Sequence, residues 1–197
     1  MKRIVFFFFI ALLFSTCSEV EFINGVPIRQ YADFVIDFSS EWNPSPNNWS
    51  SSRILGKENV YNEALPNNGY GDNTNAWSPY TRDDQREYIV VGFDTLQTVH
   101  TIEIYETWHP GAIDSVLLRK ADTQEWIRVY SKPAPTTFIA EARIFSIYIQ
   151  ETTFLVDAIR IPLDSEIDAQ KRDDNNEIIT DGWNEIDAVA ITGRRKK

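Results

Sequence analysis

Residues 99–112 read VHTIEIYETWHPGA, a pattern that predicts one strand and the way it ends. The first nine residues are rich in Val, Ile and Tyr, which favour a β-strand. Pro110 then fixes φ near about −65° and Gly111 accepts a positive φ, so this pair suits the central positions of a type II turn that His109 leads into. Glu106, at the end of the strand, is placed to accept backbone N–H bonds from a neighbouring loop and to stay ionised.

Seven other stretches also read as strands, because they are rich in Ile, Val, Tyr and Phe and are bounded by polar loops. They are residues 34–40, 87–93, 112–120, 125–131, 143–149, 155–163 and 184–193. No long segment repeats its apolar residues at the helical spacing of about 3.6. Short strands without helices predict an all-β chain, folded as a β-sandwich or barrel.

Two long connections separate these strands. Residues 41–80 are loaded with Asn, Pro, Ser and Gly, which are the residues of turns and irregular loops. Residues 164–182 form an acidic run before the last strand, predicted to be a solvated surface loop. The basic tail, residues 194–197, is expected to fray in solvent.

Residues 1–16 resemble a secretory signal peptide. A basic start precedes an apolar run, residues 4–14, which is shorter than the ~20 residues that span a bilayer. The sequence LFSTC that ends at Cys17 is similar to the lipobox of bacterial lipoproteins, in which small residues precede an invariant cysteine. Cys17 is the only cysteine, so no internal disulfide can form. The resemblance implies a diacylglyceryl thioether and an acylated amine on Cys17, with residues 17–33 as a lipidated tether.

The charge balance excludes one class of partner. Lys2 and Arg3 belong to the signal peptide, so the mature chain keeps 17 of the 19 basic residues against 29 acidic ones, a net charge of about −12. The phosphates of a nucleic acid would be repelled, so nucleic acid is not expected as a partner. Hydrophobic residues make up 43% of the chain, which is ample for the core of one domain.

Three motifs in order point to a family. AWSP at residues 76–79 is followed by ETWHPGA and then by EIDAV at residues 185–189. This order resembles the discoidin-like, galactose-binding-like domains, in particular those of pappalysin-type metalloproteases and of an F-box/leucine-rich-repeat protein's N-terminus. Those domains carry ET-x-x-PG at the end of a central strand and E-[IL]-D-A-V in the last strand. The resemblance covers roughly residues 34–193 and implies an antiparallel jelly-roll β-sandwich of about eight strands.

The same resemblance assigns structural roles. The residues concerned are Trp77, Glu106, Pro110, Gly111, Glu185 and Asp187. Trp77 stands where the relatives pack a Trp as a plug before the next strand. The relatives bind glycans, lipid headgroups or other proteins through loops at one end of the sandwich, but a shared fold does not transfer a ligand.

Catalysis and metal binding have less support. Glycosidases use two carboxyls ~5–10 Å apart beside a cleft, and Glu106 with Glu185 or Asp187 is the candidate pair. The family comparison suggests a non-catalytic module instead, so no enzyme and no catalytic residue are predicted. His100 and His109 lack the spacing of a zinc site. The stretches YGDNTN and RDDNNE offer oxygens, which leaves a structural calcium open; no metal ligand and no other cofactor is predicted.

Aromatic residues in the loops are the remaining candidates for a binding site. Sugars stack their C–H faces on such rings, and exposed aromatics also anchor protein interfaces. Both a core plug and a ligand platform stay open for Trp42, Trp49 and Trp108, whereas Trp126 and Trp183 are predicted to lie in strands and in the core. The predicted ligand-binding residues are Trp42, Trp49, Tyr70, Tyr80, Trp108 and His109.

Together these features predict a lipid-anchored, non-enzymatic binding module of a bacterial cell envelope, in the outer membrane or on the cell surface. The expected ligand is carbohydrate. The alternative is a protein-interaction or scaffold subunit of a larger envelope complex. A glycan site would be a groove with rings and amides, whereas a protein interface would be a flatter apolar patch.

Overall fold

The computed structural model describes residues 27–43, 45–82, 84–173, 175–178 and 182–195. The strands in this part of the chain are β1 (Ile28–Tyr31), β2 (Phe34–Phe38), β3 (Glu87–Gln97), β4 (Thr101–Trp108), β5 (Ser115–Lys120), β6 (Trp126–Ser131), β7 (Arg143–Tyr148), β8 (Val156–Leu163) and β9 (Glu185–Gly193). The helices are the 3₁₀ turns η1 (Ser51–Ile54), η2 (Pro66–Gly69) and η3 (Ser165–Gln170). In the described ranges, no helix has the length and apolar character that a bilayer span requires. The predicted signal peptide and Cys17 lie outside these ranges.

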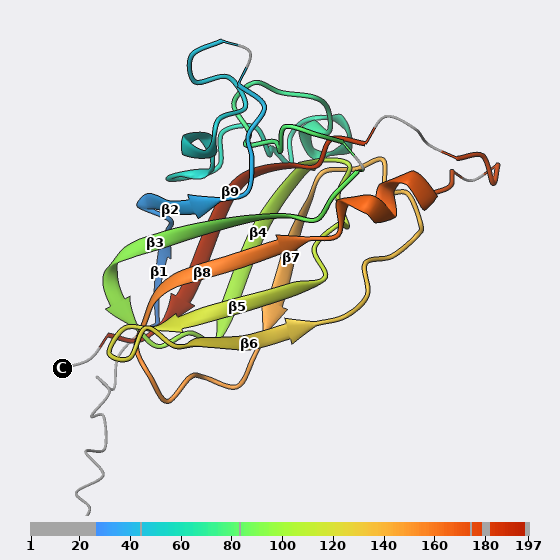
Figure 1. Ribbon diagram of the computed structural model, residues 1–197. Coiled ribbons are helices and arrows are strands. Elements are labelled where there is room, and N and C mark those ends of the chain that lie inside the picture. Colours follow the sequence, from blue (N-terminus) through green and yellow to red (C-terminus); the bar gives the residue numbers. More distant parts are fainter. Residues whose placement is uncertain (1–26, 44, 83, 174, 179–181, 196–197) are drawn as a thin grey trace, which may run out of the picture.

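The strands form two sheets packed face to face (Figure 1). The four-stranded sheet has the order β1-β9-β4-β7, and the five-stranded sheet has the order β2-β3-β8-β5-β6. Every ladder in both sheets is antiparallel. This architecture confirms the predicted all-β antiparallel sandwich, and each of the eight predicted strands is present.

β1 is a ninth strand that the sequence did not indicate. It lies within residues 17–33, which were predicted to be a tether, and it pairs with β9 so that Tyr31 stands opposite Ala190. Its four residues, IRQY, are too few for an alternating pattern to be recognised. The sandwich therefore begins at Ile28 rather than at Phe34.

The core between the sheets is apolar. In β4, for example, core side chains alternate with side chains of the other face, and Ile102 and Ile104 are fully buried. Trp77 closes one end of this core: its side chain is 0% exposed, and its Nε1 donates to the Ser40 carbonyl at 3.2 Å. The backbone of Trp77 also bridges to Ile186 of β9. Trp77 thus packs as the plug that the family resemblance implied.

The two ends of the sandwich differ in their connections (Figure 1). The end where β1 starts and β9 finishes carries the short β3–β4, β5–β6 and β7–β8 connections. The opposite end, which we call the loop end, gathers the β2–β3, β4–β5, β6–β7 and β8–β9 connections. The β2–β3 connection, residues 39–86, is the longest and carries η1 and η2.

The acidic β8–β9 connection is not wholly a solvated loop. Lys171 within it is 1% exposed, and its Nζ donates to the Pro110 carbonyl at 3.2 Å. Ser165 is 0% exposed, and its hydroxyl donates to the Gln85 carbonyl. Buried polar groups need such partners, and these two fix the connection against the loop end. The prediction of a solvated excursion is therefore wrong for this part of the connection.

Candidate ligand-binding site

The Pro110–Gly111 corner is held by Glu106 at the end of β4. Glu106 is 3% exposed; its carboxylate accepts the Gly111 N–H at 2.7 Å and pairs with the Arg143 Nε of β7 at 2.7 Å. Gly111 has a φ of 109°, a conformation that favours glycine. The Asn184 side chain donates to the His109 carbonyl at 2.7 Å and closes the corner from the other side. Glu106 thus shapes the corner.

Glu185, at the start of β9, binds a second part of the loop end. It is 1% exposed and accepts the Trp49 Nε1–H at 3.0 Å and the Asn73 N–H at 3.1 Å. Asp72 accepts from the same indole nitrogen at 2.9 Å. Burial, and then the neighbouring Asp72 carboxyl, raises the pKa of Glu185 from 4.5 to about 9, so Glu185 is protonated at neutral pH. The Trp49 indole is thereby fixed to the strand end.

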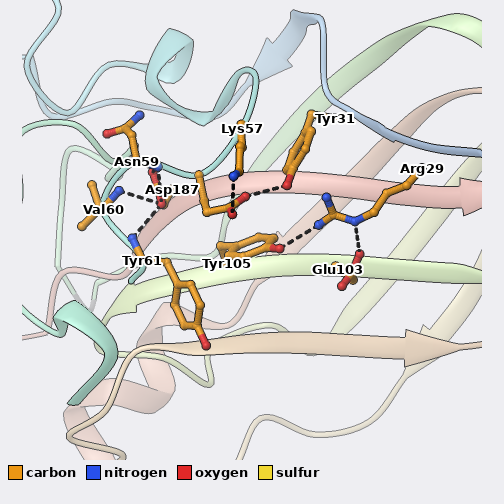
Figure 2. A network of polar contacts seen from close by, with 10 residues as sticks. Arg29, Tyr31, Lys57, Asn59, Val60, Tyr61, Glu103, Tyr105 and Asp187 are labelled. Atoms are coloured by element: carbon orange, nitrogen blue, oxygen red, sulfur yellow. Dashed lines mark hydrogen bonds and ion pairs between the residues drawn. The ribbon is translucent and has the colours of Figure 1, made fainter. Parts of the chain in front are cut away.

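Asp187 holds a third part of the loop end (Figure 2). It is 0% exposed, and one carboxylate oxygen accepts the backbone N–H groups of Asn59, Val60 and Tyr61 at 3.1, 3.0 and 2.9 Å. Burial raises the pKa of Asp187, and the three backbone donors oppose that rise. Each of the three predicted structural acids therefore binds the backbone N–H of a different loop segment.

Three aromatic side chains meet at the loop end, and we call Trp42, Tyr80 and Trp183 the rim cluster. The ring centroid of Trp42 lies 5.4 Å from that of Tyr80 and 5.6 Å from that of Trp183. The Arg82 guanidinium lies 4.9 Å from the centroid of the Trp183 ring. Tyr80 is 58% exposed, and the two tryptophans are half-buried. The rim cluster therefore offers partly exposed aromatic surface beside a cation.

Trp183 was predicted to lie in a strand and in the core, and that prediction is wrong. β9 begins at Glu185, and Trp183 precedes it in the β8–β9 connection. Its Nε1 donates to the Tyr80 carbonyl at 3.4 Å, while the Trp42 N–H donates to the Ser78 carbonyl at 2.8 Å. Two connections thus build the rim cluster, and no local sequence pattern reports such a meeting.

A second aromatic group lies where β4 ends. The ring centroid of Trp108 lies 4.6 Å from that of Tyr70 and 4.8 Å from that of His109. The ring centroids of His109 and Phe138 are 5.4 Å apart. His109 is only 3% exposed. The prediction that His109 contacts a ligand is therefore corrected, because its ring is buried among aromatic neighbours. Tyr70 and Trp108 are half-buried and join the β2–β3 connection to the end of β4.

The predicted ligand residues thus fall into three places. Trp42 and Tyr80 meet in the rim cluster, Tyr70, Trp108 and His109 form the second group, and Trp49 is bound by Glu185. Trp126, which was predicted to be core, is half-buried on the edge strand β6, with the Arg119 guanidinium 5.5 Å from its ring centroid.

The described residues contain no group of three or more His, Cys, Asp or Glu side chains that could hold a metal ion. The two oxygen-rich stretches make turns of their own. Asp173 accepts the N–H groups of Asn175 and Glu177 at 2.9 and 2.8 Å. Asn73 likewise accepts the Asn75 N–H at 3.0 Å. These contacts are those of side-chain-capped turns.

Among sequences, one curated relative is similar over most of the chain, and no family model matches. F-box/LRR-repeat protein 4 from Bos taurus is 24% identical over 198 residues, which cover 86% of this chain and 29% of the relative. The chain thus spans less than a third of that relative's length.

Among solved structures, the chain resembles β-sandwich modules. A variant of chitosan-binding module 1 from a Paenibacillus sp. IK-5 chitosanase/glucanase matches with a TM-score of 0.52 and 10% identity, over 83% of this chain and 100% of the module. A putative chitobiase fragment from Bacteroides thetaiotaomicron matches with a TM-score of 0.54 and 11% identity, over 89% of this chain and 96% of the fragment. Reduced XRCC1 bound to the DNA polymerase beta catalytic domain matches with a TM-score of 0.54 and 10% identity, over 82% of this chain and 97% of the matched chain. At these identities the likeness shows the fold.

Proposed function

We propose that this chain is a non-catalytic binding module that recognises carbohydrate through the rim cluster. Sugar rings present flat C–H faces that stack on aromatic side chains, and their hydroxyls accept hydrogen bonds from groups such as the Arg82 guanidinium. The rim cluster brings both kinds of group together at the loop end. Solved modules of the same fold include one that binds chitosan, which supports the ligand class.

The exposure of Tyr80 carries this proposal. An aromatic side chain that plugs the core is hidden from solvent, as Trp77 is at 0% exposed. Tyr80 instead keeps 58% of its surface exposed beside the half-buried indoles of Trp42 and Trp183. Large exposed aromatics that are held by packing on one side are typical of binding sites. The rim cluster is thus a better platform than the second aromatic group, in which His109 is buried.

The buried acids support a non-catalytic role. Glu106, Glu185 and Asp187 are each 3% exposed or less, and each accepts hydrogen bonds from loop backbone. A glycosidase instead places two carboxyls beside the bond that it cleaves. The three acids therefore fit the role of loop supports.

We also propose that the module is lipid-anchored at Cys17 on a bacterial envelope, in the outer membrane or at the cell surface. The lipobox-like LFSTC sequence supports this attachment. β1 starts at the end of the sandwich opposite the loop end (Figure 1). A lipid anchor on Cys17, which precedes β1 in the chain, would hold the rim cluster away from the membrane. The rim cluster could then contact a glycan.

A protein partner is the second candidate. XRCC1 has the same fold and is bound to a polymerase domain, and here Tyr148, on the edge strand β7, is 78% exposed. A glycan array probed with the purified full chain separates the two candidates. Binding to a defined set of glycans supports the carbohydrate proposal. An array without binding, together with capture of one fixed envelope protein, contradicts it.

A further inference from the structure

A separate pocket of about 450 Å³ lies beside β4, and its volume falls within the range of small-ligand sites. Its lining residues are Lys57, Glu58, Tyr61, Asn62, Glu63, Tyr105 and Ile144. Ile104 belongs to the core, so its neighbour Tyr105 points to the opposite face of the four-stranded sheet. The pocket shares no residue with the rim cluster, and all but one of its side chains carry a polar group. It therefore suits a small polar ligand.

Hydrogen bonds hold several residues of the pocket loop in place (Figure 2). Asp187 accepts three successive backbone N–H groups, those of residues 59–61, in the loop that lines the pocket. The Tyr31 hydroxyl donates to Glu58 at 2.6 Å and fixes that carboxylate. The Tyr61 and Tyr105 rings meet edge to face at 5.3 Å. A pocket built in this way loses little entropy when it binds.

Positive charge near the pocket is largely compensated. Arg29 donates to the Tyr105 hydroxyl at 2.7 Å and pairs with Glu103 at 2.6 Å. Lys57, a cation in the pocket lining, has a side chain that is 75% exposed, so solvent screens its charge, and its Nζ lies 3.8 Å from the Glu58 carboxylate.

Negative charge dominates around Tyr61. After burial, the carboxylates of Glu63, Glu141 and Glu58 raise the pKa of the Tyr61 hydroxyl. Each of these acids thus adds to a negative potential at the pocket. The face of a tyrosine ring also attracts a cation. A ligand with one positive group is therefore favoured over a neutral or anionic one.

We infer that this pocket binds an amino sugar, with its ammonium group facing the carboxylates of Glu58 and Glu63 and its ring against Tyr61. The Asn62 amide and the Tyr61 hydroxyl form hydrogen bonds with the sugar hydroxyls. An ammonium on a hydroxylated ring matches both the charge and the polar lining. This inference concerns a site other than the rim cluster and stands without it.

The test compares two tetrasaccharides that differ in charge. Tetramers of glucosamine and of N-acetylglucosamine share a backbone, but only the first is cationic at about pH 6. Calorimetric titration of the full chain is expected to give a Kd for the glucosamine tetramer about 10-fold lower. Glu63→Gln should abolish most of that preference, because Glu63 is exposed and the change removes charge alone. Equal affinity for the two tetramers would overturn the inference.

Lys57→Met provides a control of opposite sign. Removing this exposed cation should tighten glucosamine binding several-fold while Glu63→Gln weakens it. An unchanged affinity in both variants would contradict the pocket as the site. Trp42→Ala separates the two proposals: if it removes all glucosamine binding and Glu63→Gln removes none, the pocket inference fails and the rim cluster stands. The reverse result supports the pocket as the site that binds glucosamine.

Discussion

Glu185 and Asp72 accept hydrogen bonds from one and the same indole N–H, that of Trp49, at 3.0 and 2.9 Å. Glu185 is buried and Asp72 is exposed. Two carboxylates this close would repel each other, so the buried one keeps its proton. The start of β9 is therefore joined to the β2–β3 connection by a neutral acid and an indole.

Stability should fall as the pH rises through neutrality. The folded chain keeps the Glu185 proton up to about pH 9, whereas the unfolded chain releases it near the ordinary value of 4.5. Between these two pKa values the folded state binds more protons than the unfolded state. The stabilisation from Glu185 is therefore fully present below pH 4.5 and is lost as the pH rises toward about 9. Glu185→Gln keeps a neutral side chain of the same shape and should remove this decline. At about pH 9 it should be more stable than the parent by several kcal/mol.

Thermal unfolding of both proteins across that pH interval measures this difference. Parallel curves for the parent and for Glu185→Gln would show that Glu185 does not titrate in this interval, and the neutral-acid account would be wrong.

Asp187→Ala should loosen the loop at residues 59–61. The change leaves three backbone N–H groups without their carboxylate acceptor, at a cost of about 3 kcal/mol. Amide hydrogen exchange at these residues should accelerate more than elsewhere. Asp94→Ala, which removes an exposed acid of β3, is the matched control and should cost less than about 0.5 kcal/mol.

Trp77→Ala should be among the most destabilising changes in the chain. Trp77 is fully buried in the core, and truncation of such a side chain costs about 4 kcal/mol. Trp42→Ala, in the half-buried rim cluster, should cost less than half as much. Urea titration of the two variants checks the difference. Similar midpoints would mean that the rim cluster is part of the core.

Cys17→Ser should release the chain from membranes or block its processing, because the proposed lipid attaches to the thiol. Fractionation of cells that express each form, followed by immunodetection, measures the membrane share. An equal membrane share in the two forms would rule out acylation at Cys17.

The strands could be predicted because alternation is a local signal. The Ile102 and Ile104 positions of β4 can be read from the sequence alone, whereas β1 becomes a strand only through its pairing with β9. The candidate binding site was harder to predict from the sequence. Trp42 and Tyr80 were candidates as loop aromatics, but Trp183 meets them only because two distant connections fold over the same end. Burial of His109 depends likewise on Tyr70, Trp108 and Phe138, which no local pattern reports.

The central claim is that the rim cluster binds a glycan, and the affinity of Trp42→Ala for a glycan identified on the array tests it most directly. Tyr148→Ala, which removes an exposed ring of β7 at the opposite end of the sandwich, is the matched control. We predict that Trp42→Ala raises the Kd about 10-fold or more while its unfolding midpoint stays close to that of the parent, and that Tyr148→Ala leaves the Kd unchanged. A Kd that Trp42→Ala does not change would contradict the proposed function.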